Sequence, residues 1–246
     1  MIRYTDSRKM ERGHQGVVDS YFHFSFADYC HPDNVRFGVL RVLNDDEVKP
    51  ETGFPPHSHT DMEIISYIID GELTHGDSMG NEETLSRGQV QYMSVGTGVT
   101  HSEMNYGKTP LRFLQIWILP DGKGHQPNYG GAKFRLADRY DQWLPLATGG
   151  ANPSAPIKVH QDINAYAAII TAGKKLDFAV AANRQAYLVL IEGRVSADVS
   201  DASASASVSG VKLSKRDAAE IIGQNITVAA EETAHVFIIE MAKAAE

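Results

Sequence analysis

Apolar and polar residues alternate with a period of two along most of the first half of the chain, which is the pattern of half-buried β-strands. Turn-forming residues interrupt this alternation roughly every 8–12 positions, as in sandwiches and barrels of antiparallel strands. One short helix is expected, at residues 138–146. Strands are predicted at residues 35–43, ending at the turn signal Asn44-Asp45-Asp46, and at 62–69, 71–75, 90–95, 99–105 and 111–119.

A loop-forming segment rich in Gly, Ala, Asn and Pro, residues 146–156, separates these strands from a second series. The second series faintly repeats the first. Residues 66–73 resemble residues 187–195, and residues 85–89 resemble residues 213–217. The repeat predicts an all-β chain folded as two barrels of similar plan. Strands of the second series are predicted at residues 157–160, 166–171, 175–181, 187–191, 194–199, 226–229 and 236–241.

The composition narrows the class of protein without indicating its chemistry. A length of 246 residues with 42% hydrophobic content fits a soluble globular chain that folds without disulfides. The single cysteine, Cys30, is typical of a reducing compartment. No apolar run exceeds six residues and the start of the chain does not resemble a secretory signal, so we expect a cytoplasmic protein without membrane contact. A net charge of −8 without a long Lys/Arg cluster argues against direct nucleic-acid binding.

Two short motifs have the composition of a metal site. His57-Ser58-His59 places two imidazoles on one face of an extended chain, and His101-Ser102-Glu103 repeats the spacing with a carboxylate. An isolated His-x-His pair also occurs by chance on surface strands. Three imidazoles and one carboxylate, each motif beside a Gly-rich turn, predict a divalent transition-metal site with open positions for substrate or dioxygen.

Two glutamates compete for the place of the carboxylate ligand. Counting by two along an extended strand, Glu63 shares a face with His57, and Glu103 shares a face with His101. The spacing alone leaves both possible.

The motifs resemble those of the cupins, in which a Gly, an HxH pair and a Glu form the first motif. A Gly-rich turn, a His and an Asn form the second. Glycine replaces the usual proline of the second motif here, and Glu103 is inserted between its His and its Asn. The matching residues are Gly53, His57, His59, Glu63 and Gly71, then Gly88, Gly96-Thr97-Gly98, His101 and Asn105.

With these departures from the cupin pattern, the sequence resembles the pirin family, and within it the bacterial quercetinase branch. The match runs nearly end to end and is densest between residues 20 and 120. It is carried by Phe24-Ser25-Phe26 and by residues 38–46, 77–81, 96–103, 115–118 and 158–162.

The resemblance implies a bicupin. An N-terminal cupin barrel, residues 1–135, would hold the metal, and a degenerate C-terminal barrel, residues 136–246, would lack metal ligands. The implied ion is Fe(II), with Mn(II), Co(II), Ni(II) and Cu(II) as alternatives, because imidazole ligands discriminate little among these ions.

The resemblance also implies that Glu103 completes the ligand set of His57, His59 and His101. Glu63, the ligand of ordinary cupins, then becomes an inward group close to the ligands or a satisfied buried carboxylate.

Three further residues are predicted to line the substrate cavity. Phe54 stands three residues before His57, and Met93 and Gln115 lie on strands that flank the two motifs. His75, next to a turn, is assigned a structural role.

The function implied by the resemblance is a metal-dependent 2,3-dioxygenase that cleaves flavonols such as quercetin and releases carbon monoxide. Its partners would be a small phenolic or flavonol substrate and dioxygen, with Glu103 as the catalytic base that takes the proton of the substrate hydroxyl. Two other functions stay open: a pirin-like metal-dependent regulatory protein that binds a protein partner, and a non-catalytic barrel that binds a phenolic compound.

Overall fold

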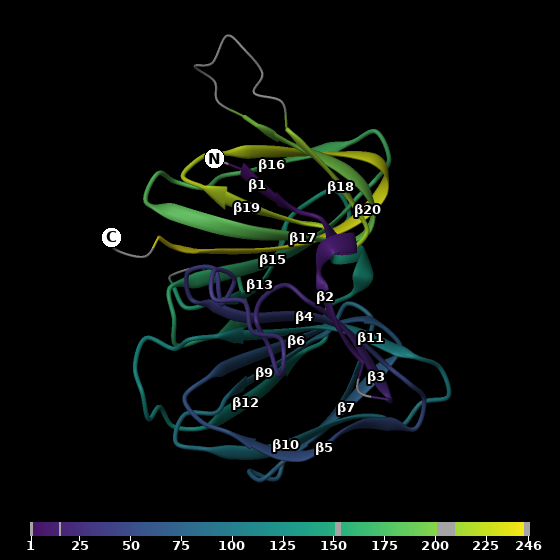
Figure 1. Cartoon of the computed structure of the whole chain (residues 1–246), viewed down its shortest axis with the longest axis vertical. Helices are drawn as coiled ribbons and strands as arrows, with labels where there is room; N and C mark the ends of the chain where they lie inside the picture. Colours follow the sequence, from purple (N-terminus) through teal and green to yellow (C-terminus); the bar gives the residue numbers. More distant parts are fainter. Residues whose placement is uncertain (1, 15, 151–153, 201–209, 244–246) are drawn as a thin grey trace. The chain divides into compact units, whose positions relative to one another are not determined.

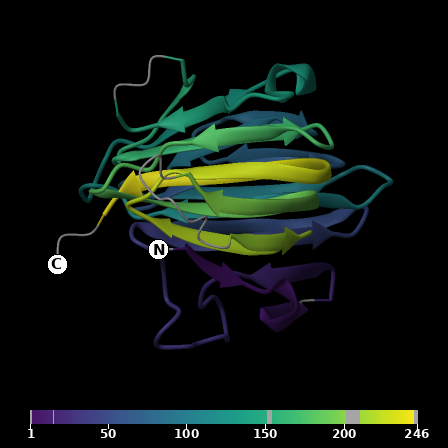
Figure 2. The same ribbon diagram turned by 90° about the horizontal axis from the view of Figure 1, so that it is seen from above.

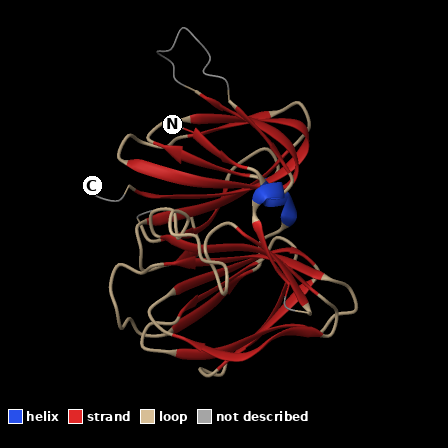
Figure 3. Cartoon of the chain, viewed as in Figure 1, coloured by secondary structure: helices blue, strands red, loops and turns tan. Residues whose placement is uncertain are grey.

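The computed structural model describes residues 2–14, 16–150, 154–200 and 210–243. These residues form strands and connecting loops almost throughout, with two short 3-10 helices (Figure 3). The chain divides into two compact units. The N-terminal unit comprises Met10–Leu136 and Ile157–Gln161; the C-terminal unit comprises Met1–Lys9, Ala137–Pro156 and Asp162–Glu246.

Two short segments depart from the expected division at residues 135 and 136. Residues 1–9 cluster with the C-terminal unit, because β1 (Ile2–Thr5) pairs antiparallel with β19 (Ala218–Ile222). Residues 157–161 cluster with the N-terminal unit, where the backbone N–H of His160 donates a hydrogen bond to buried Glu63. Both assignments depend on partners far away in the sequence, which local patterns do not reveal.

The N-terminal unit is a barrel of two antiparallel sheets. One sheet has the order β12-β9-β6-β11-β4-β3-β2, and the other has the order β5-β10-β7-β8. Figure 1 shows β5 and β10 on one side of this barrel and β6, β9 and β11 on the other. The strands are β2 (Glu11–His14), β3 (Val18–Phe22), β4 (Leu40–Val48), β5 (Thr52–His59), β6 (Glu63–Asp70), β7 (Glu72–Asp77), β8 (Glu82–Ser86), β9 (Val90–Ser94), β10 (Val99–Asn105), β11 (Leu111–Ile118) and β12 (Asn128–Ala132).

The C-terminal unit is built around two long strands, β17 (Arg184–Val199) and β20 (Ile226–Ala242). Its sheet runs β1-β19-β17-β20-β15-β13, with β20 central in Figure 2. At Gly193 (φ +87°) an added Cβ would lie 2.5 Å from the carbonyl oxygen of Thr233, so only glycine fits where these strands cross closely. The remaining elements are η1 (Ser7–Lys9), η2 (Leu136–Arg139), β13 (Leu144–Thr148), β14 (Ile157–Lys158, in the N-terminal unit), β15 (Ile163–Ile170), β16 (Lys175–Phe178) and β18 (Val211–Ser214).

The turn expected at Asn44-Asp45-Asp46 is wrong, because these three residues lie in the middle of β4 and are all buried. Their side chains alternate. Asp45 receives two hydrogen bonds from the buried guanidinium of Arg112, whereas Asn44 and Asp46 line a cavity. These polar residues resemble a turn in the sequence, but they lie in a buried strand and face either Arg112 or the cavity.

The short helix expected at residues 138–146 is also wrong in extent. The structure has a 3-10 helix at Leu136–Arg139, and the last residues of the predicted helix belong to β13 (Leu144–Thr148). In the part of the chain that is described, neither helix has the length and hydropathy required to cross a membrane.

Candidate metal centre

Two paired strands bring the three histidines together. His57 lies directly opposite His101 in the antiparallel pair of β5 and β10, and His59 shares the face of His57 because side chains alternate along a strand. The ring centroids are 4.4 Å apart for His57 and His101, 4.8 Å for His57 and His59, and 5.2 Å for His59 and His101. One nitrogen from each ring lies within 4.8 Å of the others, a spacing that fits a single shared metal ion.

The chemistry of these nitrogens also fits a metal ion. His59 Nε2 and both ring nitrogens of His101 are buried without a hydrogen-bond partner. The Nδ1–H of His57 donates to the carbonyl oxygen of Pro55 at 2.8 Å, which leaves its Nε2 with the lone pair. Burial lowers the pKa of His59 to about 4 and that of His101 to about 3, so both rings are neutral near pH 7. Neutral imidazoles with unused lone pairs are the form that binds a transition metal.

Glu103 lies next to this cluster but is held by other residues. It follows His101 by two positions on β10 and faces the same side of the sheet, where it is fully buried. Its Oε1 accepts a hydrogen bond from Ser66 Oγ at 2.8 Å, and its Oε2 accepts one from Gln115 Nε2 at 2.6 Å. Burial raises the pKa of Glu103, and the two hydrogen bonds oppose this effect. The structure therefore brings three of the four expected ligands into one cluster and places the fourth in the adjoining wall.

The cavity beside the histidines has a volume of about 350 Å³. Phe54 and Gln115 lie in its wall as predicted, although the amide of Gln115 is used to hold Glu103. Trp117 contacts the His59 ring edge-on, with centroids 4.7 Å apart. The lining residues are Ser20, Phe22, Phe26, Ala27, Asn44, Asp46, Phe54, Pro55, Pro56, His57, His59, Glu103, Gln115 and Trp117.

Several residues that line the cavity or hold Glu103 were missed from the sequence. Ser66 and Trp117 lie on β6 and β11, and their proximity to the ligands follows from the pairing of strands that are distant in the sequence. Asn44 and Asp46 carried a signal, a polar pair two residues apart after an alternating apolar run, but that signal was interpreted as a turn.

Met93 does not lie in the cavity wall. It is fully buried in an apolar cluster with Ile64, Val95 and Val99. Met93 stands opposite Ile64 in the pair of β9 and β6, so its position follows from a register that the sequence pattern did not provide.

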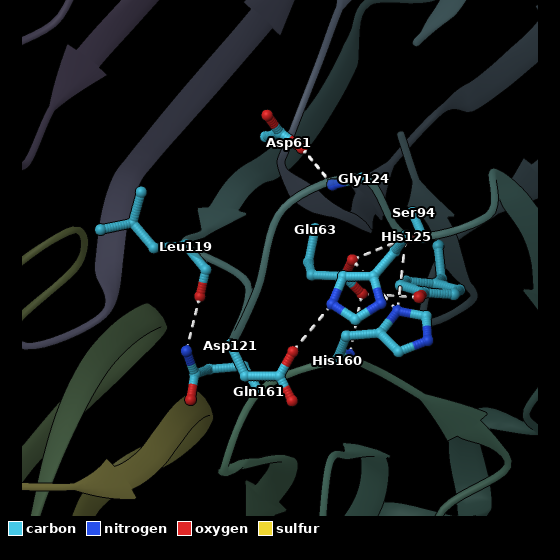
Figure 4. Close-up of polar contacts among 10 residues, drawn as sticks. Asp61, Glu63, Ser94, Leu119, Asp121, Gly124, His125, His160 and Gln161 are labelled. Carbon is cyan, nitrogen blue, oxygen red and sulfur yellow. Dashed lines mark hydrogen bonds and ion pairs between the residues drawn. The ribbon is translucent and has the colours of Figure 1, made fainter. Parts of the chain in front are cut away.

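Glu63 likewise does not adjoin the histidine cluster. It lies three residues before Ser66 on β6 and so faces the opposite side of the sheet. Figure 4 shows what holds it there. Its carboxylate accepts hydrogen bonds from Tyr92 Oη at 2.6 Å, from Ser94 Oγ at 2.7 Å and from the backbone N–H of His160 at 3.0 Å. Glu63 is therefore the satisfied buried carboxylate of the two interpretations given above, and it fixes residues 157–161 to the N-terminal unit.

His75 has a structural environment, as expected. Its Nε2 lies 2.9 Å from Oδ2 of Asp77, and its ring stacks on Tyr129 with centroids 4.5 Å apart. Asp77 also receives hydrogen bonds from Asn81 in the following turn. This network supports the wall behind His101, whose ring centroid is 5.6 Å from that of His75.

Comparisons with known proteins bear on the whole chain. A family model described as pirin matches residues 5–118, and one described as the quercetinase C-terminal cupin domain matches residues 147–241. A pirin-like protein of Caulobacter vibrioides is 38% identical over 235 residues, which cover 95% of this chain and 97% of that protein. The chain belongs to the pirin family. The quercetin 2,3-dioxygenase of Escherichia coli K12 is 35% identical to this pirin over 235 residues, which cover 94% of this chain and 95% of the relative.

Solved structures agree with this assignment. YhhW from Escherichia coli superposes on this pirin with a TM-score of 0.89 at 32% identity, covering 100% of both chains. A complex of YhhW with nickel(II), which is described as a bacterial pirin, gives a TM-score of 0.88 at 32% identity over 99% of this chain and 100% of that one. The predicted family and the bicupin fold are thus confirmed. At the level of the family, the cupin fold and the names of the relatives support a metal-dependent dioxygenase.

Proposed function

We propose that this pirin is a metal-dependent dioxygenase that cleaves flavonols such as quercetin, with dioxygen as co-substrate and carbon monoxide as one product. The observation that carries the proposal is the convergence of three imidazoles, His101 buried and His57 and His59 half-buried, beside a largely apolar cavity that also contains a buried carboxylate. The names of the quercetin dioxygenase relatives support the choice of substrate.

His57, His59 and His101, with Glu103 as fourth ligand, would hold the metal. The unused nitrogens of the histidines fit Fe(II), the ion that we propose, and they fit Mn(II), Co(II), Ni(II) or Cu(II) by the same chemistry. When bound, such an ion lowers the pKa of a substrate hydroxyl and supports the reaction with dioxygen.

The protein's own contribution begins with Glu103. Its pKa is raised by burial, so its carboxylate is suited to take and retain the proton of the flavonol 3-hydroxyl. Ser66 and Gln115 each hold one oxygen of this carboxylate, which fixes its orientation without a charged partner. We therefore assign Glu103 as the base and Ser66 and Gln115 as positioning residues.

The apolar wall supplies the second contribution. Phe22, Phe26, Phe54 and Trp117 line the cavity, and aromatic side chains of this kind bind a flat ring system and exclude water from it. Overall, a flavonol and dioxygen give a depside and carbon monoxide, and both oxygen atoms of dioxygen are retained in the depside. No additional reductant is required.

The C-terminal unit would take no part in the chemistry. Within its described residues no group of three candidate ligands lies close enough to share an ion. We propose that this barrel is a degenerate cupin without metal.

The proposal is tested by removing metal with a chelator, reloading the protein with each candidate ion and measuring dioxygen uptake with quercetin. Uptake should depend on the ion and should vanish in His59→Ala. Loss of quercetin at the same slow rate in the reloaded protein and in protein-free buffer would refute the enzyme and favour the metal-dependent regulatory protein.

A further inference from the structure

Two buried acceptor oxygens of the cavity residues have no hydrogen-bond partner among the described residues. They are Oδ1 of Asn44 and Oδ1 of Asp46, and each residue is only 2% exposed. A buried acceptor without a donor destabilises a fold, and nearly all such groups in proteins are paired. Two of them in the wall of one cavity indicate that a molecule entering the cavity supplies the donors.

Asp45, the residue between Asn44 and Asp46, differs from both because its carboxylate oxygens are paired. Asp45 points to the other side of β4, and there both of its carboxylate oxygens accept hydrogen bonds from Arg112. The chain therefore satisfies the outward carboxylate of this segment completely. The two neighbours that point into the cavity keep an unused oxygen each.

Strand pairing places these acceptors relative to the proposed reaction centre. Asn44 lies opposite Gln115, which holds the carboxylate of Glu103, and Asp46 lies opposite Ser20 of the next strand. Strands are about 5 Å apart and residues two positions apart on a strand are about 7 Å apart. Asn44 and Asp46 therefore lie farther along the cavity wall than Glu103, at a separation comparable to the size of one aromatic ring.

The surroundings define the class of ligand. The neighbouring cavity wall is made of Phe22, Phe26, Phe54 and Trp117, which suit the faces of a planar aromatic molecule. A molecule that matches both features is aromatic, binds the metal through one hydroxyl and carries further hydroxyl groups at a distance from it.

We infer that Asn44 and Asp46 accept hydrogen bonds from hydroxyl groups of the substrate that are remote from the metal, and that they make the cavity selective for polyhydroxylated aromatic compounds. This inference rests on the proposed function for the orientation of the ligand. It adds the residues that determine specificity and the chemical feature that they recognise.

The test compares two flavonols that share the metal-binding 3-hydroxyl and carbonyl: quercetin, which has hydroxyls on both ring systems, and 3-hydroxyflavone, which has no other hydroxyl. Binding to the metal-loaded protein is measured without dioxygen by quenching of Trp117 fluorescence, in a Trp143→Phe background that leaves Trp117 as the sole tryptophan. Quercetin should bind about tenfold more tightly or better. A purely apolar cavity predicts the reverse order, because 3-hydroxyflavone is the less polar compound.

Substitutions assign the preference to its residues. Asn44→Leu removes the acceptor and keeps the branched shape of the side chain, so it should reduce the preference for quercetin toward equality, as should Asp46→Ala. Phe26→Leu, on the apolar wall, is the matched control and should weaken both flavonols alike. An unchanged preference in both Asn44→Leu and Asp46→Ala would overturn the inference.

The role of Asn44 and Asp46 can be tested separately from the proposed dioxygenase activity. If Asn44→Leu does not fold, Asn44→Ala and the comparison of the two flavonols on the parent protein decide the matter. If quercetin is preferred but not cleaved, the proposed dioxygenase fails while the selectivity stands. If quercetin is cleaved but not preferred over 3-hydroxyflavone, only the role of Asn44 and Asp46 fails.

Discussion

The two barrels of this pirin are built from the same kind of antiparallel strands, yet they fill their interiors in different ways. Among the described residues, the C-terminal interior contains a large apolar cluster that includes Leu188, Leu190 and Val236, together with many alanines. The described residues of the N-terminal barrel form smaller apolar clusters and a cavity with histidines, carboxylates and amides in its wall. An interior filled with apolar side chains stabilises a fold. Buried polar groups lower that stability, but they can form a binding site.

Two glutamates of the N-terminal barrel show a similar difference between a structural and a chemical environment. Glu63 and Glu103 are both about 1% exposed, so burial does not distinguish them. Glu63 accepts hydrogen bonds from the backbone and two hydroxyls on the outer side of its sheet, and Glu103 faces the histidine cluster. The side of the sheet that a carboxylate faces determines whether it is structural or available for chemistry.

The largest effect is expected at the histidines. His57→Ala or His101→Ala removes one of three convergent nitrogens, and the metal content should fall from about one ion per chain to almost none. Elemental analysis of purified protein measures this, with His125→Ala as a control that leaves the cluster intact. Because no second site is expected in the C-terminal barrel, full occupancy in both variants would contradict the comparison between the barrels.

The two glutamates should differ strongly in their effect on turnover. Glu103→Gln removes the proposed base and should lower kcat for quercetin by about 100-fold or more. Glu63→Gln should change kcat by less than about tenfold, because its partners Tyr92, Ser94 and His160 lie away from the cavity. Steady-state kinetics with matched metal loading decides between them. The reverse ranking would restore the ligand pattern of ordinary cupins.

The apolar barrel should respond in stability and not in chemistry. Leu188→Ala leaves a void in the C-terminal cluster and should lower the free energy of unfolding by about 2–5 kcal/mol. Urea denaturation measures the loss, and elemental analysis should find the metal content of the folded variant unchanged. Metal loss from a variant that remains folded would show that the two barrels are not functionally separate.

The smallest effect concerns the pH dependence of stability. Burial raises the pKa of Asp46 from 3.8 to about 7, so between these values the folded chain retains a proton that the unfolded chain has lost. The contribution of Asp46 to stability is therefore lost as the pH rises from about 4 to about 7. Asp46→Asn removes this loss and should gain up to about 4 kcal/mol relative to the parent protein at the upper end of that interval. Parallel unfolding curves at pH values across the interval test this, and an identical slope in both proteins would contradict it.

The features of the fold and the site that depend on local spacing could be predicted from the sequence. His57, His59 and His101 could be identified because an HxH pair and an HxE pair fix which side chains share a face of a strand. The two-barrel architecture followed from alternation and from the faint repeat. These features depend on residues that are close in the sequence, so they can be recognised before the fold is known.

The parts that failed depend on which strands are neighbours. Met93 does not line the cavity as predicted, because the pairing of β6 and β9 places it in an apolar cluster. For Glu63 the sequence leaves two interpretations open, and only the side of β6 that it faces shows that it is the satisfied buried carboxylate. Asn44 and Asp46 were interpreted as a turn because buried polar residues in a strand contradict the usual pattern. Such contradictions concentrate at functional sites, where local preference is given up for chemistry.

Labelling with heavy-isotope dioxygen tests whether the N-terminal barrel cleaves a flavonol through its histidine cluster. Metal-reloaded protein is given quercetin under labelled dioxygen, the depside is analysed by mass spectrometry and the gas phase is analysed for carbon monoxide. We expect a depside that carries both labelled atoms, unlabelled carbon monoxide in equal amount, and neither product from His59→Ala. Quercetin loss without carbon monoxide, or the same products at the same rate from His59→Ala, would contradict it.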